Sequence, residues 1–391
     1  MARARIASKV KSKIQMVVFG EAFTGKSTFC SELAYMKNPD GTPFKVLYLD
    51  PESGSIDDYL PDMEKNGVDL RNIYIVYTQS LQEVNEYIEK AKAHEPFYVL
   101  DEDGNETDDI VVDANGKQFK PDAIVVDGAS ILNLTTKQGL LEFSKRRAAV
   151  RADDAGIIGD KRAVKVDGAS LEMKDWQTIG FRGQDLILTL TGSGLHYIVT
   201  ARETDEKKQM LINGKSESVA TGRKIPEGFK EMDYNAKTVI RFFREEDDPE
   251  TVKACIVKDR THVHKAGEII DDPNLIDWQS IIDATAKDDD FVVKNDLHSA
   301  IETEKKSYDK ENNSIANEVV DKPEETDSKS TELDELRSKI LQLKKSMNPV
   351  VDNKYKTELK KVSLNKNPKN IDDKEALEKM LKIAEDIIKV K

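Results

Sequence analysis

The stretch VVFGEAFTGKSTFC, residues 17–30, decides how this chain folds. An apolar run ends at Gly20, and four residues separate it from Gly25-Lys26-Ser27. Apolar residues return after this motif. This order fits the pattern G-x-x-x-x-G-K-[ST] between a strand-like run and a helix-compatible run. Glycines at both ends let backbone N–H groups turn inward around phosphate oxygens. The sequence therefore predicts a phosphate-binding loop that holds a nucleoside triphosphate.

The residues of this loop have separate expected roles. Lys26 is expected to reach the β- and γ-phosphates, and Ser27 is expected to ligate Mg²⁺. The dipole of the following helix adds a favourable potential for anions. ATP and Mg²⁺ are therefore the predicted cofactors. The predicted nucleotide-binding residues are Gly20, Glu21, Ala22, Phe23, Thr24, Gly25, Lys26, Ser27 and Thr28.

Composition narrows the class of protein. Hydrophobic residues make up 38% and charged residues 34% of the 391 residues, so part of the chain is expected to remain unpacked. Cys30 and Cys255 lie in apolar surroundings without metal-type spacing, which is typical of a reducing cytosol. No apolar run approaches the roughly 18 residues that span a bilayer. We read residues 1–13 as a short basic arm and predict a cytoplasmic protein.

Charge divides the chain into regions. The net charge of −13 argues against a generally basic surface that coats nucleic acid. Residues 287–330 carry 7 Lys and 13 Asp or Glu with few aromatic residues, so residues 286–330 are predicted to be a disordered acidic linker. Residues 331–391 carry 15 basic and 11 acidic residues and contain two amphipathic stretches. They are predicted to form a small helical module.

Residues 14–285 alternate short apolar runs with helical stretches, which is typical of an α/β fold with a mostly parallel sheet. Asp-Gly and Asn-Gly turn signals within residues 97–119 predict a hairpin inserted between a helix and the next core strand. The predicted strands are Met16–Phe19, Lys45–Leu49, Ile73–Tyr77, Ala123–Val126, His196–Thr200, Thr238–Phe243 and Lys253–Lys258.

Two carboxylates are placed where nucleotide chemistry needs them. DAIVVDGAS puts Asp127 at the carboxyl end of a buried strand, the Walker B arrangement, where it would hold Mg²⁺ through its water shell. KVLYLDPESGS ends another strand in Asp50-Pro51-Glu52. A carboxylate there can lie near the γ-phosphate and orient the attacking water, so Glu52 is the candidate catalytic base.

The order of these features resembles the RecA/RadA class of recombinase ATPases. LYLDPESGS resembles the strand and Asp-x-Glu of that class, and AIVVDGAS resembles its Walker B strand. HYIVTARET is similar to the strand that ends in the γ-phosphate sensor, and CIVKDRTH is similar to the K-x-R end of a late strand. The order is most similar to the short phage RecA-like ATPases of single-strand annealing and recombination. The resemblance covers about residues 14–265.

The resemblance implies roles for single residues. Thr200 with Arg202 takes the sensor position, where the family commonly has Gln or Asn. Lys258 and Arg260 become fingers that reach the nucleotide of a neighbouring subunit in a ring or filament. The catalytic residues predicted on all these grounds are Lys26, Glu52, Asp127, Thr200, Lys258 and Arg260, with Ser27 and Asp127 at the metal.

The resemblance also implies where single-stranded DNA would bind, because RecA-like folds turn the loops after the Walker B helix and the sensor strand toward a central axis. Basic residues cluster in both segments, and clustered basic residues in flexible loops can follow a phosphate backbone. The predicted DNA-binding residues are Lys145, Arg146, Arg147, Arg151, Lys161, Arg162, Lys165, Lys207, Lys208, Lys215, Arg223 and Lys224.

Three functions remain open from the sequence. The first is a Mg²⁺-dependent, oligomeric ATPase that acts on single-stranded DNA in phage-type recombination or annealing. The second is a replicative helicase or helicase loader. The third is an ATP-switched interaction protein without DNA-dependent turnover. In each case we predict that the C-terminal helices bind a single-strand-binding or replication protein.

Overall fold

The computed structural model describes residues 13–212, 215–229, 232–283, 300–308, 336–341, 343–344, 347, 349–361 and 373–389. The chain divides into two compact units, Met1–Glu304 and Lys305–Lys391. The predicted basic arm lies outside the described residues except for Lys13. No helix within the described ranges has both the length and the apolar content that crossing a bilayer requires.

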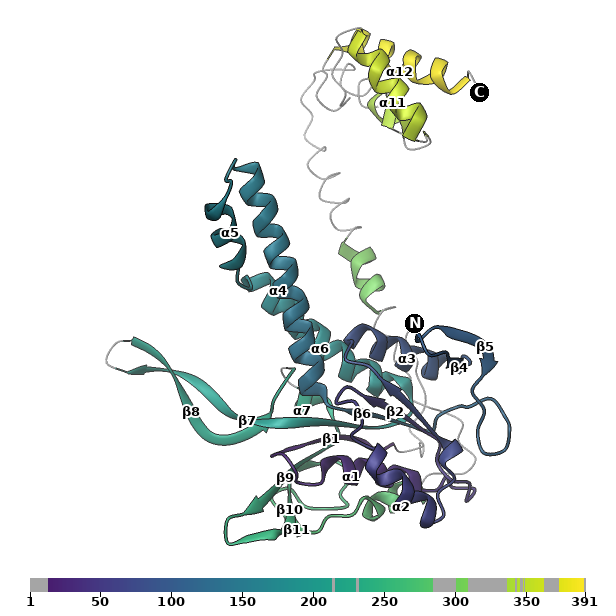
Figure 1. Ribbon diagram of the computed structural model, residues 1–391, viewed down its shortest axis with the longest axis vertical. Coiled ribbons are helices and arrows are strands. Elements are labelled where there is room, and N and C mark those ends of the chain that lie inside the picture. Colours follow the sequence, from purple (N-terminus) through teal and green to yellow (C-terminus); the bar gives the residue numbers. More distant parts are fainter. Residues whose placement is uncertain are drawn as a thin grey trace, which may run out of the picture. The chain divides into compact units, whose positions relative to one another are not determined.

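The first unit is built on a nine-stranded sheet, shown in Figure 1. The strand order is β11-β10-β9-β1-β7-β6-β2-β3, and β8 pairs with β7. The strands from β9 to β3 pair in parallel, whereas β8, β10 and β11 add antiparallel pairs. The predicted α/β fold with a mostly parallel sheet is therefore confirmed. The strands are β1 (Gln15–Gly20), β2 (Val46–Asp50), β3 (Ile73–Tyr77), β6 (Ala123–Asp127), β7 (His196–Ile212), β8 (Lys215–Pro226), β9 (Thr238–Glu245), β10 (Asp248–Asp259) and β11 (Ile269–Asp271).

Strand β1 is the centre of the unit. Every residue of β1 is buried, and Val17 pairs in parallel with Val199 of β7 and with Val239 of β9. Because successive side chains of a strand point to opposite faces, Val17 and Phe19 belong to one core cluster while Met16 and Val18 belong to another. The apolar run before Gly20 thus serves two cores at once, which is why it contains no polar alternation.

Helices cover both faces of the sheet. The core that contains Val17 includes apolar residues of α3, α4, α6 and α7, and the core that contains Met16 includes those of α1, α2 and α8. The helices are α1 (Lys26–Ser31), α2 (Leu60–Lys65), α3 (Leu81–Ala93), α4 (Ala129–Asp154), α5 (Asp160–Asp167), α6 (Met173–Ser193), α7 (Met232–Asn235) and α8 (Gln279–Asp283).

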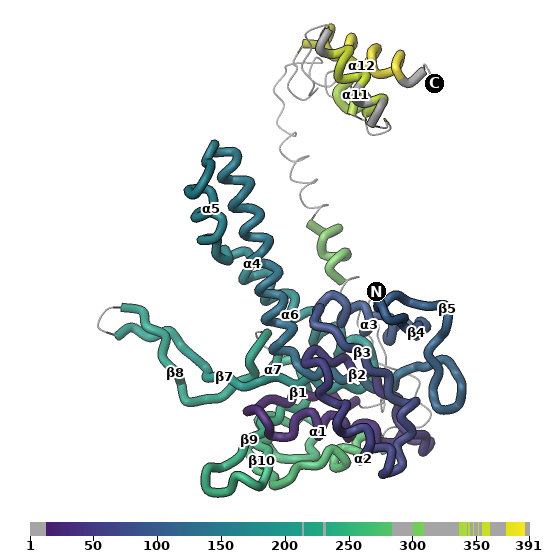
Figure 2. The backbone as a smooth tube through the Cα atoms, viewed as in Figure 1, coloured from purple at the N-terminus to yellow at the C-terminus, as the bar shows by residue number. Residues whose placement is uncertain are grey.

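Two arms project from this unit (Figure 2). We call residues 141–180 the helical arm, because it consists of the end of α4, α5 and the start of α6. We call residues 203–226 the hairpin arm, because β7 and β8 pair there in antiparallel fashion, with Lys207 opposite Ala220. Residues 144–165 and 203–224, within these arms, were predicted to be flexible loops, and that prediction was wrong. Their backbone groups are satisfied in a helix pair and in a ladder of strand hydrogen bonds.

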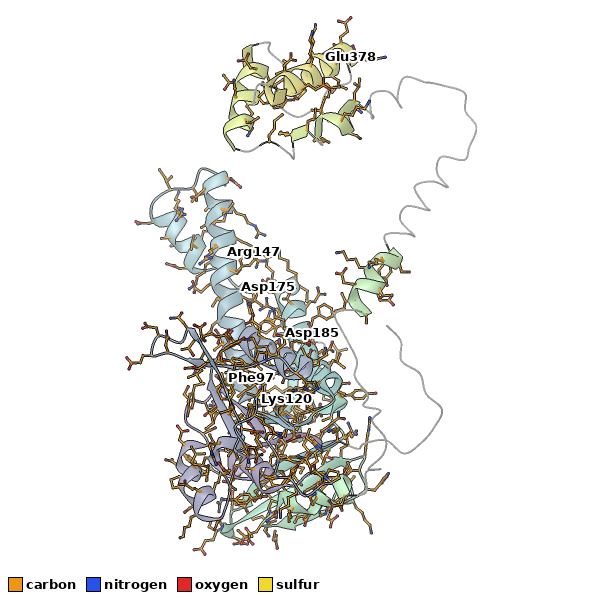
Figure 3. All side chains as sticks on the ribbon, turned by 90° about the vertical axis from the view of Figure 1, so that its right-hand side faces the viewer. Phe97, Lys120, Arg147, Asp175, Asp185 and Glu378 are labelled. Atoms are coloured by element: carbon orange, nitrogen blue, oxygen red, sulfur yellow. The ribbon has the colours of Figure 1, made fainter. Side chains whose placement is uncertain are left out.

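The predicted hairpin insertion at 97–119 is present, with β4 (Tyr98–Leu100) and β5 (Glu106–Ile110) paired in antiparallel fashion. Phe97 and Phe119 at its two ends are fully buried (Phe97 is labelled in Figure 3). Their ring centroids lie 5.6 and 5.9 Å from that of Tyr74. The insertion is therefore anchored to the core at both ends.

The second unit is helical in its described part. Residues 336–341 and 343–344 are helical, and α11 (Pro349–Lys361) and α12 (Lys374–Lys389) follow. These helices enclose a small apolar core, whose buried members are Ile340, Tyr355, Leu359, Leu377, Met380 and Ala384.

Residues 300–308 form a helix within the stretch that was predicted to be a disordered linker. The remainder of that stretch, residues 286–299 and 309–330, lies outside the described residues.

Candidate nucleotide-binding site

A cavity of about 750 Å³ opens where β1, β2 and β6 reach their carboxyl ends, beside residues 200–203 of β7. Parallel strands end at the same edge of a sheet, so the loops that follow them meet there. The cavity is lined by Gly20, Glu21, Ala22, Phe23, Thr24, Gly25, Lys26, Ser27, Glu52, Ser55, Tyr59, Asp127, Gly128, Thr200, Ala201, Arg202, Glu203, Lys224 and Glu227.

The loop after β1 is shaped by its two glycines. A Cβ atom on Gly20 would lie 2.0 Å from the carbonyl oxygen of Phe242, so no larger residue fits beside β9. Gly25 has a φ of 77°, a left-handed conformation that favours glycine. Lys26 Nζ donates to the backbone oxygen of Glu21 at 2.5 Å, which folds the side chain back across the loop. Burial lowers the pKa of Lys26, against the opposing effect of the nearby carboxylates.

Asp127 is buried at the end of β6, and both of its carboxylate oxygens accept hydrogen bonds. Thr200 Oγ1 donates to Oδ1 at 2.6 Å, and the hydroxyls of Tyr48 and Ser55 donate to Oδ2 at 2.6 and 2.7 Å. The three donors come from β7, from β2 and from the loop after β2. This network holds the carboxylate in one orientation at the floor of the cavity.

Asp50 shapes the loop that carries Glu52. Its carboxylate accepts from four successive backbone N–H groups, those of residues 52–55, at 2.7 to 3.0 Å. The side chain of Glu52 passes over Gly128, where an added Cβ would lie 2.9 Å from Glu52 Cγ. The Asp-x-Glu pattern therefore combines a loop-forming carboxylate with a second one that faces the cavity.

Arg202 and Glu52 meet across the cavity, with Arg202 Nη2 3.3 Å from Glu52 Oε1. Next to Arg202, Glu203 is 7% exposed at its side chain and pairs with Arg241 of β9 at 2.8 Å. Lys224, from the root of the hairpin arm, lies 3.0 Å from Asp205 and 3.7 Å from Glu203. The hairpin arm thus contributes charged groups of both signs to the cavity wall.

The structure brings most of the predicted site residues together. Glu52, Asp127 and Thr200 join the loop residues from Gly20 to Ser27 around the cavity, whereas Thr28 lies on α1 outside the lining.

Lys258 and Arg260 lie elsewhere, at the end of β10 and just beyond it. Lys258 Nζ donates to three backbone oxygens at the end of α7, those of residues 233, 234 and 236, at 2.6 to 3.2 Å. Arg260 is exposed, and its guanidinium makes no ion pair with the described residues.

The predicted DNA-binding residues lie on the two arms. Seven of them pair with carboxylates of the same arm or its base: Lys145, Arg147, Arg151, Arg162, Lys208, Arg223 and Lys224. The pair of Arg147 with Asp175 is labelled in Figure 3. Five make no ion pair with the described residues: Arg146, Lys161, Lys165, Lys207 and Lys215.

Sequence reasoning missed Tyr48 and Ser55 as partners of Asp127, and it assigned Lys224 to DNA binding and not to the cavity. Tyr48 stands inside an apolar strand, where its hydroxyl gives no pattern, and its contact with Asp127 spans 79 residues. Ser55 follows Asp-x-Glu directly and could have been found from the serines in the quoted stretch PESGS. Lys224 reaches the cavity only because β8 folds back along β7.

The oxygen atoms at the cavity are suitable ligands for Mg²⁺, a hard cation that prefers oxygen ligands. The hydroxyl of Ser27 lines the cavity and makes no hydrogen bond with the described residues. The Asp127 carboxylate lies at the same cavity. Ser27 and Asp127 are therefore the residues that would hold the ion, directly and through water.

Fold and cavity together have the geometry of a P-loop site on a mostly parallel α/β sheet. Among solved structures, the chain is similar to the RadB recombinase, with 15% identity and a TM-score of 0.35, over 66% of this chain and 86% of that one. It is also similar to a KaiC-like protein of Pyrococcus horikoshii, with 14% identity and a TM-score of 0.32, over 68% and 99%. No protein-family model matches the sequence, and no curated protein matches it.

Proposed function

We propose that this protein is a RecA-like, Mg²⁺-dependent ATPase that acts in the cytoplasm on single-stranded DNA, in phage-type recombination or annealing. The observation that best supports ATPase activity is that Lys26, Asp127 and Glu52 line one cavity together with the glycine-rich loop. These are the three charges that phosphoryl transfer to water requires: one for the phosphates, one for the metal and one for the nucleophile.

Each residue has a definite task in this proposal. Backbone N–H groups of residues 20–27 hold the phosphates, and Lys26 leaves the Glu21 carbonyl to bind them. Ser27 and Asp127 would hold Mg²⁺, which when bound would supply positive charge against the phosphates. Glu52 orients the attacking water from its loop above Gly128.

Arg260 is the better supported of the two residues proposed to act on a neighbouring subunit. Its side chain is exposed and unpaired within the described chain, whereas Lys258 is already bound to three carbonyl groups of α7. A head-to-tail ring or filament would use Arg260 as the finger and Lys258 as the residue that fixes the end of α7. Arg260→Ala is then expected to abolish turnover in the assembled protein while ATP binding persists.

The five unpaired basic residues of the arms support contact with DNA. Those on the helical arm are Arg146, Lys161 and Lys165, and those on the hairpin arm are Lys207 and Lys215. A basic residue paired with a carboxylate adds little net positive charge to its arm, so these five would supply most of the salt-dependent part of the affinity.

The test is ATP turnover of the purified protein with and without single-stranded DNA, beside Lys26→Ala as the inactive control. We expect DNA to stimulate turnover, and we expect the triple variant Arg146→Gln, Lys161→Gln, Lys207→Gln to lose most of this stimulation. The matched control, Lys145→Gln with Arg162→Gln, removes only paired charges and should keep it. DNA-independent turnover in the wild-type protein would favour the ATP-switched interaction protein, and unwinding activity would favour a helicase.

For the second unit we propose binding to a single-strand-binding or replication protein. Its separate apolar core supports a module that keeps its fold while it binds a partner. Retained capture of such partners after deletion of residues 331–391 would contradict this role.

A further inference from the structure

Two oppositely charged side chains, Arg202 and Glu52, meet across the cavity. Their side chains are 56% and 37% exposed, and the closest atoms are 3.3 Å apart. Exposed ion pairs of this kind contribute little stability, so a stronger partner can replace either member at low cost. A nucleotide phosphate is such a partner, because guanidinium and phosphate form two parallel charge-assisted hydrogen bonds.

The backbone on which Arg202 stands is held firmly. Its N–H donates to Ser130 Oγ at 2.9 Å, and its carbonyl accepts from the N–H of Glu227 at 2.6 Å. Ser130 in turn donates to the carbonyl of Glu227 at 2.7 Å. Only the side chain of Arg202 is therefore left to move between Glu52 and the cavity.

Glu52 is held in a comparable way. Its loop is fixed by Asp50, and Gln79 Nε2 donates to the carbonyl of Pro51 at 3.2 Å. Its carboxylate is thus within reach of Arg202 without any movement of the backbone. The pair can open and close by side-chain rotation alone.

Arg202 is also the cation best placed to change partner. The cavity lining includes three cationic side chains: Lys26, Arg202 and Lys224. Lys224 is bound between Asp205 and Glu203, and Glu203 is already held by Arg241. Among the described residues, the guanidinium of Arg202 pairs with one carboxylate, that of Glu52, the proposed catalytic one.

We infer that Arg202 is a positioning residue that holds Glu52 until a γ-phosphate replaces it. With a triphosphate bound, the guanidinium turns to the γ-phosphate, and Glu52 becomes free to orient water. A diphosphate lacks the group that competes, so the pair stays closed. This inference rests on the proposed ATPase, and it assigns to Arg202 the discrimination between ATP and ADP.

The test is a double-mutant cycle on nucleotide affinity, which needs no turnover. Affinities for the non-hydrolysable triphosphate AMP-PNP and for ADP are measured with Mg²⁺ for wild type, Arg202→Met, Glu52→Gln and the double variant. Arg202→Met should weaken AMP-PNP binding about tenfold or more and change ADP binding by less than about twofold. Glu52→Gln should strengthen AMP-PNP binding, because it removes the competing partner.

The double variant separates this mechanism from simple repulsion between Glu52 and the γ-phosphate. If Arg202 and Glu52 compete, the gain from Glu52→Gln disappears when Arg202 is Met. If the gain is equal in both backgrounds, repulsion explains it and the inference is wrong. Arg202→Lys should recover part of the preference for the triphosphate.

A matched control is Arg71→Met, which removes an exposed arginine paired with Asp69 away from the cavity. It should leave both affinities unchanged. A wild-type protein that binds neither nucleotide would refute the proposed ATPase itself, whereas normal binding with an unchanged ATP-to-ADP ratio in Arg202→Met would refute only the role of Arg202.

Discussion

The nucleotide cavity and the two arms use the same residue types in different ways. At the cavity and in the loop beside it, the buried carboxylates of Asp127 and Asp50 accept hydrogen bonds on both oxygens from groups that the fold holds in place. On the helical arm, carboxylates such as Asp153 pair with arginine at the surface. Buried networks fix geometry, while exposed pairs contribute little. Side-chain orientation is therefore better fixed at Asp50 and Asp127 than at Asp153.

Apolar side chains follow the same division. Those of β1, β2 and β6 lie in two cores, whereas on the arms Trp176 and Leu211 are 50% and 81% exposed. Exposed apolar residues that gather on projecting elements are typical of surfaces that meet another molecule.

The strongest test of this division removes one apolar side chain from each region. Phe97→Ala should lower the free energy of unfolding by about 3 to 5 kcal/mol, because Phe97 is fully buried among aromatic rings. Leu211→Ala on the hairpin arm should leave it nearly unchanged, since that side chain is already in solvent. Chemical denaturation measures both, and equal losses would show that the arm is part of the core.

A second test uses one added methyl group. Gly20→Ala should destabilise the fold by about 3 kcal/mol and abolish nucleotide binding, because the new Cβ would overlap the Phe242 carbonyl. Gly139→Ala on α4 meets no atom within 4 Å and should be neutral or slightly stabilising. Thermal unfolding and nucleotide titration report the two effects separately. Wild-type affinity in Gly20→Ala would mean that the loop does not need its close approach to β9.

A third test compares two carboxylates. Asp127→Ala leaves the hydroxyls of Tyr48, Ser55 and Thr200 without their acceptor, and we expect a loss of about 2 kcal/mol. Asp153→Ala removes an exposed partner of an arginine, and its denaturation midpoint should stay at the wild-type value. A larger shift of the denaturation midpoint in Asp153→Ala than in Asp127→Ala would contradict the view that the buried carboxylate contributes more stability than the exposed one.

The smallest effect concerns pH. Burial raises the pKa of Glu32 from 4.5 to about 7, so the folded state binds its proton more tightly than the unfolded state. The resulting stability is present below pH 4.5 and is lost as the pH rises through 7. Glu32→Gln keeps an acceptor for the N–H of Leu275 and should remove this loss, about 1 kcal/mol after allowance for partial exposure.

The measurement is the free energy of unfolding of wild type and of Glu32→Gln as a function of pH, and the difference between the two curves is the quantity compared. Asp153 serves as the contrast from the arm, because Arg162 lowers its pKa and its contribution is lost only as the pH falls below about 3.8. A flat difference between pH 4.5 and 7 would contradict the assignment for Glu32.

The central strands could be predicted because burial on both faces leaves unbroken apolar runs such as that before Gly20. The hairpin arm could not, because its strands are mostly exposed and carry mainly polar and charged residues, with a short apolar run at 210–212. The loop residues, Asp127 and Glu52 followed from motif spacing, since each stands where a strand ends. The contact of Tyr48 with Asp127 depends on strand order, with β2 beside β6, and strand order is not encoded locally.

The four hydrogen bonds to Asp50 have a consequence for how this site can vary. The course of the loop is set by the Asp50 side chain and by backbone N–H groups. Every residue type except proline provides such an N–H group. The identities of the side chains at 52 and 55 are therefore independent of the loop's course. A chain built this way can exchange its reactive carboxylate for another function while the frame around it stays intact, so the scaffold and the chemistry can evolve separately.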